Sequence, residues 1–230
     1  MYAEIAGGAY AEYARVPQAL AARKPTNLTF EEAATVPLAG NTALQGMRDV
    51  AKVQPGHRVL VNGASGGVGT FAVQIARALG AEVTGVCSTR NVELVRSLGA
   101  AHVIDYTAED FTTSGLRYDV VLDLVGNHSL AACRRALTPK GMLLLSSGNG
   151  GRVLGPLGRM VRALALSVMV RQRLAVLTVK PGEHLDALTA MIESGQITPV
   201  VERIFPLVEA ADAFRYYAQE HPRSKVVITL

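Results

Sequence analysis

Residues 59–70 read VLVNGASGGVGT, and this stretch decides the fold of the chain. Its first half is a short apolar run typical of a buried strand, and its glycine-rich second half opens a segment with helical periodicity. Ala64, Gly66 and Gly69 occupy the GxGxxG spacing, with alanine in the first place. That spacing alone is a weak signal, but a strand precedes it, a helix follows it and a second strand candidate begins at Glu82. The stretch therefore predicts the first βαβ unit of a dinucleotide-binding sheet.

Short β-branched apolar runs alternate with helical segments from Arg58 onward, which is the sequence form of a parallel sheet covered on both faces. The first helix ends at Gly80, a natural C-cap, and a second runs from Asn91, whose side chain is expected to cap it, to Gly99. We expect an α/β fold with a doubly wound parallel sheet of the Rossmann type. Its six strand candidates are residues 58–62, 82–87, 102–106, 118–125, 142–147 and 174–179.

Both ends of the chain differ from this middle part. Residues 8–16 read as a strand, Thr29 and Glu32 form a capping box, and two helices near 185–192 and 210–217 precede a closing strand at 225–230. We expect residues 1–40 and 181–230 to form one additional lobe beside a nucleotide-binding domain at 41–180. The segment 148–158, rich in glycine and arginine, is expected to be a mobile loop.

The composition excludes several classes of protein. With 49% hydrophobic and 18% charged residues, the 230-residue chain is expected to fold, and its charge of +4 is too dispersed to favour nucleic acid. Arg162, Arg171 and Arg173 interrupt the apolar stretch 160–179, and no signal-peptide pattern opens the chain, so we expect neither a membrane span nor export. Cys87 and Cys133 lack metal or disulfide spacing, which favours a reducing, cytoplasmic compartment.

The glycine turn suits a pyrophosphate, because bare backbone can approach it and the free N–H groups of a helix N-terminus hold its charge. Two alternatives remain open: a tight strand-to-helix turn that needs glycine for geometry alone, and a methyltransferase-type Rossmann fold. The second usually has an acidic residue at the end of its second strand, and the chain has Cys87 there.

The same missing acid favours NADPH over NADH, because an Asp or Glu would bind the ribose 2′-hydroxyl and repel a 2′-phosphate. The chain instead continues with Ser88, Thr89 and Arg90, whose hydroxyls and guanidinium can donate to a phosphate. The alternative is that Ser88 and Thr89 cap the following helix and that Arg90 is solvated.

Beyond these residues, nearly the whole chain resembles the zinc-independent medium-chain dehydrogenase/reductase family, in its quinone oxidoreductase or zeta-crystallin-like branch. The resemblance rests on several motifs in the same order. They are GGAYAEYARVP, EEAATVPLAGNTAL, GASGGVGTFAVQIARALGAEV, LVRSLGAAHVIDY, SGQITPVVERIFPL and KVVITL.

The resemblance implies a set of contacts to the cofactor NADPH. It assigns the pyrophosphate to Ser65, Gly66, Gly67 and Val68. It assigns the 2′-phosphate to Ser88, Arg90 and Tyr106, for which a packed strand-end aromatic is the alternative at Tyr106. It places Thr42 and its neighbour Asn41 by the nicotinamide, with a helix N-cap as the alternative for Thr42. Its weaker implications are Gly126, Gly148 and Lys225.

The chain departs from the family in two places. Zinc-containing relatives have a cysteine ligand where this chain has Leu38, and the five histidines lack ligand spacing, so we expect no catalytic zinc. Family members begin with most of a GroES-like catalytic lobe, and this chain starts near the end of that lobe. We therefore expect residues 1–40 and 181–230 to be the remnant of that lobe, in a fragment, a sequence with a misassigned start or a natural truncation.

The resemblance implies hydride transfer to a quinone or to the β-carbon of an enone, by a protein that works as a homodimer. The cofactor carries the chemistry, and the residues present offer no general acid, so no catalytic residue is assigned. Two alternatives stay open. One is a noncatalytic NADPH-binding protein, and the other is an enoyl-thioester reductase in which residues 148–159 accept a phosphorylated carrier.

Overall fold

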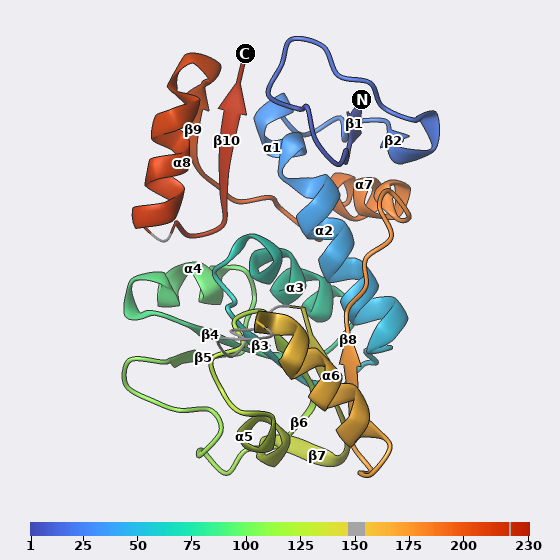
Figure 1. The fold of residues 1–230 in the computed structure, drawn as a ribbon, viewed down its shortest axis with the longest axis vertical. Helices are drawn as coiled ribbons and strands as arrows, with labels where there is room; N and C mark the ends of the chain where they lie inside the picture. The colour runs from blue at the N-terminus through green and yellow to red at the C-terminus, as the bar shows by residue number, and fades with distance from the viewer. Residues whose placement is uncertain (147–154, 221) are drawn as a thin grey trace.

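The computed structural model describes residues 1–146, 155–220 and 222–230. A six-stranded sheet in the order β5-β4-β3-β6-β7-β8 forms the lower part of the molecule in Figure 1, and all its strands run parallel. This order confirms the expected doubly wound Rossmann sheet. The strands are β3 (Arg58–Asn62), β4 (Glu82–Cys87), β5 (His102–Asp105), β6 (Tyr118–Asp123), β7 (Leu137–Leu145) and β8 (Arg173–Val176).

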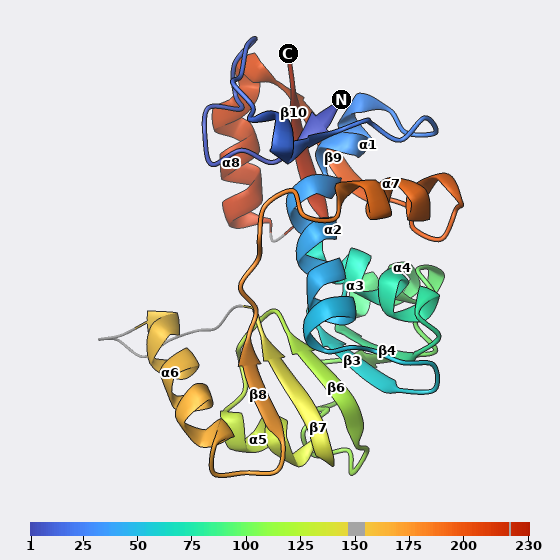
Figure 2. The same cartoon turned by 90° about the vertical axis from the view of Figure 1, so that its right-hand side faces the viewer.

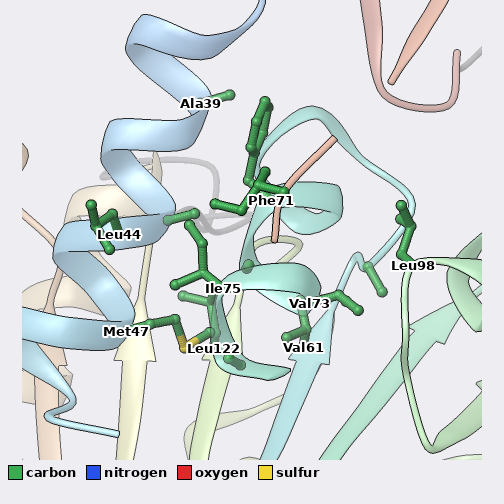
Figure 3. Close-up of a cluster of buried hydrophobic side chains, with 14 of the residues drawn as sticks. Ala39, Leu44, Met47, Val61, Phe71, Val73, Ile75, Leu98 and Leu122 are labelled. Carbon is green, nitrogen blue, oxygen red and sulfur yellow. The ribbon is translucent and has the colours of Figure 1, made fainter. Parts of the chain in front are cut away.

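Side chains that alternate along each strand divide the interior into two cores. Val61 of β3 packs with Phe71 and Ile75 against helix α2 (Val36–Leu44), as Figure 3 shows. Leu60 packs on the opposite face of the sheet with Cys133. Burial of both faces explains why the strands read as nearly continuous apolar runs. The covering helices are α3 (Gly67–Ala78) and α4 (Val92–Ser97) on one face, and α5 (Leu130–Arg135) and α6 (Gly155–Ser167) on the other.

The two chain ends pack together in the upper lobe of Figures 1 and 2. The hydroxyl of Tyr2 donates to the carbonyl of Leu185 at 2.7 Å, and the capping box of Thr29 and Glu32 is confirmed. The division into 1–40, 41–180 and 181–230 stays a prediction. The elements of this lobe are β1 (Tyr2–Ala3), the 3-10 turn η1 (Gln18–Leu20), β2 (Ala21–Ala22), α1 (Phe30–Ala34), α7 (Leu185–Glu193), β9 (Val201–Pro206), the 3-10 turn η4 (Leu207–Glu209), α8 (Ala210–Gln219) and β10 (Lys225–Thr229). Helix α2 and the π-helix η2 (Gln45–Val50) lead from this lobe into the sheet domain, where the 3-10 turn η3 (Thr89–Asn91) lies between β4 and α4.

Three expectations about elements need correction. Residues 8–16 are exposed and form no strand, because no neighbouring strand receives their backbone hydrogen bonds. Helix α6 already begins at Gly155, so residues 155–158 are not a loop, and residues 147–154 lie outside the described part. Strand β7 begins five residues earlier than expected, at Leu137, which pairs with Tyr118 before an irregularity in the ladder.

In the described ranges, no helix combines the length and the apolarity that crossing a bilayer requires.

Candidate nucleotide-binding site

The turn between β3 and α3 is closed by its own backbone. Gly63 has a φ of +90°, which glycine adopts without strain, and its N–H donates to the carbonyl of Val86 at 3.1 Å. The N–H of Gly66 donates back to the carbonyl of Gly63 at 3.1 Å. Helix α3 then begins at Gly67, and its first-turn N–H groups have no carbonyl one turn earlier in the helix. N–H groups at a helix N-terminus and the positive end of the helix dipole are favourable to an anion.

The glycines of this turn are required for different reasons. A methyl group at Gly69 would lie 2.0 Å from the carbonyl oxygen of Gly63, so close packing of helix on strand excludes a side chain there. A methyl group at Gly67 would lie 2.7 Å from Cδ of Lys225. Gly66 has a negative φ of −79°, and a methyl group there would meet the Gly63 oxygen at 3.4 Å, an ordinary contact distance. Contact with backbone thus explains Gly69, a methyl group at Gly67 would displace the flexible side chain of Lys225, and packing does not explain Gly66.

The turn before β10 lies against the start of α3. The N–H of Ser224 donates to the carbonyl of Ser65 at 2.7 Å, and its hydroxyl donates to the carbonyl of Val200 at 2.6 Å. This turn places Lys225 beside Gly67, with Nζ 3.7 Å from the position of an added methyl group. Burial lowers the pKa of Lys225. An anion bound at the turn would offset this desolvation and favour the charged ammonium group.

The loop after β4 is tied to the glycine turn by Asn91. Its Nδ2 donates to Oγ of Ser65 and to Oγ of Ser88, each at 3.1 Å. The predicted cap is therefore wrong: the side chain makes no capping bond to α4, because its amide is used between the two loops. Ser88 precedes the 3-10 turn η3 without a capping bond either, so the alternative role for Ser88 as a cap is not found.

Arg90 belongs to this loop, and Tyr106 follows the neighbouring strand β5. The Arg90 guanidinium donates to the carbonyl of Glu220, at the end of α8, at 3.1 Å. Tyr106 is 58% exposed, so the alternative that it is a packed strand-end aromatic is wrong. Thr89 donates to Asp105 at 2.6 Å, and this bond lowers the pKa of the Asp105 carboxyl. The loop therefore has its guanidinium bonded to the end of α8 and its threonine hydroxyl bonded to a neighbouring carboxylate, while the phenol of Tyr106 lies exposed beside it.

A cavity of about 390 Å³ opens between the glycine turn and the upper lobe. Tyr10 and Phe214 meet edge to face in its wall, with ring centroids 5.7 Å apart. The cavity thus combines the start of α3 with aromatic side chains from α8 and from Tyr10. Its lining residues are Tyr10, Gly67, Val68, Ala213, Phe214, Tyr217, Ser224, Lys225, Val226 and Ile228.

The remaining predicted residues lie apart from this cluster or are engaged elsewhere. Asn41 is fully buried, and its amide donates to the carbonyl of Lys180 at 2.8 Å. Thr42 lies in the last turn of α2 and donates to the carbonyl of Leu38, one turn earlier, at 2.7 Å, so its alternative role as an N-cap is wrong. Gly126 has a φ of +74° in the loop after β6. Gly148 lies outside the described residues.

A buried ion pair at the end of β6, between Asp123 and Arg159, is not among the features predicted from the sequence. Asp123 is fully buried and accepts hydrogen bonds from Arg159 at 2.6 Å, from Nδ2 of Asn62 at 2.9 Å and from the N–H of Gly126 at 2.9 Å. It therefore fixes the loop that contains Gly126 and anchors α6 to the sheet. Burial and the Asp123 charge raise the pKa of Cys133 to about 12. The signal for it in the sequence is the carboxylate of Asp123 at the end of the largely apolar strand β6.

One group of possible metal ligands occurs among the described residues. Asp49, Glu183 and His184 place ligand atoms within 4.8 Å of one another. His184 is already bonded to Asp49 at 2.6 Å and to the guanidinium of Arg48 at 2.8 Å, which puts a positive charge beside the group. The absence of a zinc site at Leu38 stays a prediction.

Comparison with known proteins agrees with this architecture. Residues 98–228 match the family described as zinc-binding dehydrogenase. The chain is 36% identical to the mouse (Mus musculus) mitochondrial NAD(P)H oxidoreductase RTN4IP1, over 97% of this chain and 61% of that protein. It is 34% identical to the chloroplastic NADPH-dependent alkenal/one oxidoreductase of Arabidopsis thaliana, over 96% and 53%. The quinone oxidoreductase of Coxiella burnetii superposes with a TM-score of 0.81 at 29% identity, over 93% and 65%.

The fold and the glycine turn define a Rossmann-type α/β protein with a glycine-rich first turn at the start of α3. The chain belongs to the zinc-binding dehydrogenase family of medium-chain dehydrogenases/reductases, as the resemblance of its motifs indicated. It spans 61% of the mouse relative, 53% of the plant relative and 65% of the Coxiella chain.

Proposed function

We propose that this chain is an NADPH-dependent reductase that transfers hydride to a quinone or to an α,β-unsaturated carbonyl compound. The observation that carries the proposal is Gly66, where packing gives no reason for glycine, beside the first-turn N–H groups of α3 and the ammonium of Lys225. A pyrophosphate needs such a bare approach to backbone N–H groups. The names of the relatives supply the reaction: an NAD(P)H oxidoreductase, an NADPH-dependent alkenal/one oxidoreductase and a quinone oxidoreductase.

The residues present fit a nicotinamide dinucleotide. The α3 turn would hold the pyrophosphate, and the loop after β4 would hold the 2′-phosphate. A bound reduced nicotinamide supplies the hydride, which is chemistry that side chains do not provide. The residues proposed to hold the cofactor are Ser65, Gly66, Gly67 and Val68 at the pyrophosphate, Ser88, Arg90 and Tyr106 at the 2′-phosphate, and Asn41 and Thr42 by the nicotinamide. Gly126, Gly148 and Lys225 are weaker candidates for contacts to the cofactor.

The preference for NADPH over NADH rests on Arg90. Strand β4 ends at Cys87, which cannot bind a ribose hydroxyl as a carboxylate would. The nearby carboxylate of Asp105 belongs to β5 and accepts from Thr89 at 2.6 Å, so hydroxyl donors face it. A guanidinium can donate two parallel hydrogen bonds to a phosphate. We therefore propose that Arg90 contributes more to binding of the 2′-phosphate dianion than the hydroxyl groups of the same loop do.

The chain's own residues would bind and orient the reactants and exclude water. Tyr10, Phe214 and Tyr217 supply apolar surface in the cavity next to the turn. No described side chain is assigned as a general acid, and we propose that water protonates the product. Zinc plays no part in this proposal, because Leu38 offers no ligand atom.

We further propose a homodimer in a reducing compartment such as the cytoplasm. Strand β8 ends the sheet on one side, so its outer edge can pair with a second copy, and the exposed Val168 and Met169 lie nearby in the chain. Cys87 and Cys133 are both buried free thiols, which suits reducing conditions. Sedimentation equilibrium tests the dimer, and a monomer at all concentrations would overturn it.

The experiment that tests the function has two readouts on the purified chain. Titration calorimetry measures binding of NADPH and NADH, and the decay of nicotinamide absorbance measures turnover with a benzoquinone and with an enal. Tight NADPH binding with turnover supports the proposal. Binding without turnover of either acceptor would replace hydride transfer with the noncatalytic alternative, and no binding of either nucleotide would overturn the nucleotide site itself.

A further inference from the structure

Asn91 lies between the two loops that the proposed cofactor would contact. Its side chain is buried, with 5% of the residue exposed, and its Nδ2 is 3.1 Å from Oγ of both Ser65 and Ser88. Ser65 belongs to the turn after β3, and Ser88 follows β4. A single amide group thus holds hydroxyl groups from two βα loops, each of which is proposed to bind a different anionic group.

The chemistry of an amide nitrogen decides the direction of these bonds. It carries two protons and can only donate, so each serine oxygen accepts a hydrogen bond from Asn91. The hydroxyl proton of each serine therefore stays available for another acceptor. Phosphate oxygens only accept, so both serines are left as donors of the kind that a pyrophosphate and a 2′-phosphate require.

A purely structural role explains the same geometry less well. Asn91 precedes α4 but makes no capping bond to it. Its Oδ1 is buried and has no hydrogen-bond partner among the described residues, which is a cost that a residue retained for stability alone would not carry. An acceptor in place of Nδ2 would take both serine protons and leave only lone pairs to face a phosphate.

We propose that Asn91 is a positioning residue that makes Ser65 and Ser88 hydrogen-bond donors to the two anionic groups of NADPH. The inference rests on the proposed function and deepens it, because it couples the pyrophosphate and 2′-phosphate subsites through one buried amide. Asn91 touches neither group itself. Its effect on affinity should therefore disappear when the two serines are absent.

The test is a mutant cycle read by titration calorimetry on the full chain. The variants are Asn91→Ala, Asn91→Asp, the pair Ser65→Ala with Ser88→Ala, and the triple variant that adds Asn91→Ala to this pair. Asn27→Ala is the matched control, because its amide also donates to a protein oxygen, the carbonyl of Ile192, away from both loops. The melting temperature of each variant without nucleotide reports on folding.

Asn91→Ala should weaken NADPH binding about tenfold and NADH binding less, because NADH lacks the group proposed for Ser88. In the background without the serines, the same substitution should change the Kd less than about twofold. Asn91→Asp should lose about a further tenfold, because its carboxylate accepts both serine protons and adds a negative charge. Asn27→Ala should bind NADPH as the unaltered chain does.

An equal loss from Asn91→Ala with and without the serines would overturn the proposal, as would an Asn91→Asp variant that binds NADPH as well as the unaltered chain. Should Asn91→Ala fail to fold, the Asp variant, which keeps the shape of the side chain, decides the matter. An unaltered chain that binds neither nucleotide overturns the proposed function and this inference together. An unaltered chain that binds NADPH while all Asn91 variants match it overturns the inference alone.

Discussion

Replacing Gly66 by alanine adds one methyl group where the proposed pyrophosphate approaches the backbone. The fold should tolerate it, because the residue has a φ of −79° and the new methyl group would meet the Gly63 oxygen at 3.4 Å. Alanine is a poorer N-cap than glycine by about 0.5 to 1 kcal/mol, and the loss of unfolded-state entropy offsets about as much. The melting temperature of the chain without nucleotide should therefore shift by no more than about 4 °C.

The cost to binding should be much larger than the cost to stability. A methyl group at this position would keep phosphate oxygens from the first-turn N–H groups of α3. The loss of one hydrogen bond to a charged group is worth about 1.5 to 3 kcal/mol, which is a loss of affinity of roughly 10- to 150-fold. Titration calorimetry with NADPH and with NADH should show similar losses for both, because both carry the pyrophosphate.

Gly69→Ala is the matched control. Its methyl group would lie 2.0 Å from the carbonyl oxygen of Gly63, so helix α3 must move away from β3, at a cost of about 1 to 3 kcal/mol or more. This variant should melt about 2 to 12 °C lower than the unaltered chain. Two results would refute the reasoning: a Gly66→Ala variant with unchanged affinity, or one destabilised as much as Gly69→Ala, which would make both glycines structural.

Arg90→Ala should weaken NADPH binding about 10- to 100-fold and NADH binding little, and equal losses in calorimetry would contradict the placement of the 2′-phosphate. Arg159→Met should leave Asp123 buried without its cation, cost about 3 kcal/mol and lower the melting temperature by about 6 to 12 °C; an unchanged melting temperature would show that this ion pair contributes little. Because burial raises the pKa of Cys87 to about 11 and that of Cys133 to about 12, a disulfide reagent at about pH 8 should modify both thiols only after denaturation, and rapid labelling of the native chain would contradict their burial.

The local pattern of apolar runs and glycines is sufficient to predict most strands of the sheet. Strands β3 and β4 begin and end where the apolar runs do, and Gly80 and Gly99 follow their helices with positive φ as predicted. Each of these signals depends on neighbours within a few residues, so it can be found without knowledge of the fold. Residues 8–16 failed as a strand for the opposite reason, because pairing requires a partner that no local pattern guarantees.

The candidate site was predicted only in part. The turn from Ser65 to Val68 was found, because its residues are contiguous and each glycine has a local consequence. Asn91 was expected to cap a helix, since its amide can serve a cap or a distant hydroxyl equally well, and only the approach of the two loops decides between them.

By itself, the sequence determined that a strand would run into a glycine turn and a helix, and that no carboxylate would end the second strand. It did so because backbone conformation and apolar periodicity are set by adjacent residues. Only the tertiary structure decided that Lys225 lies against Gly67 and that Asp123 meets Arg159, residues separated by long stretches of chain. Buried charged and polar groups lose their hydrogen bonds to water and need partners within the protein. Which partner lies within reach depends on the packing of the whole sheet.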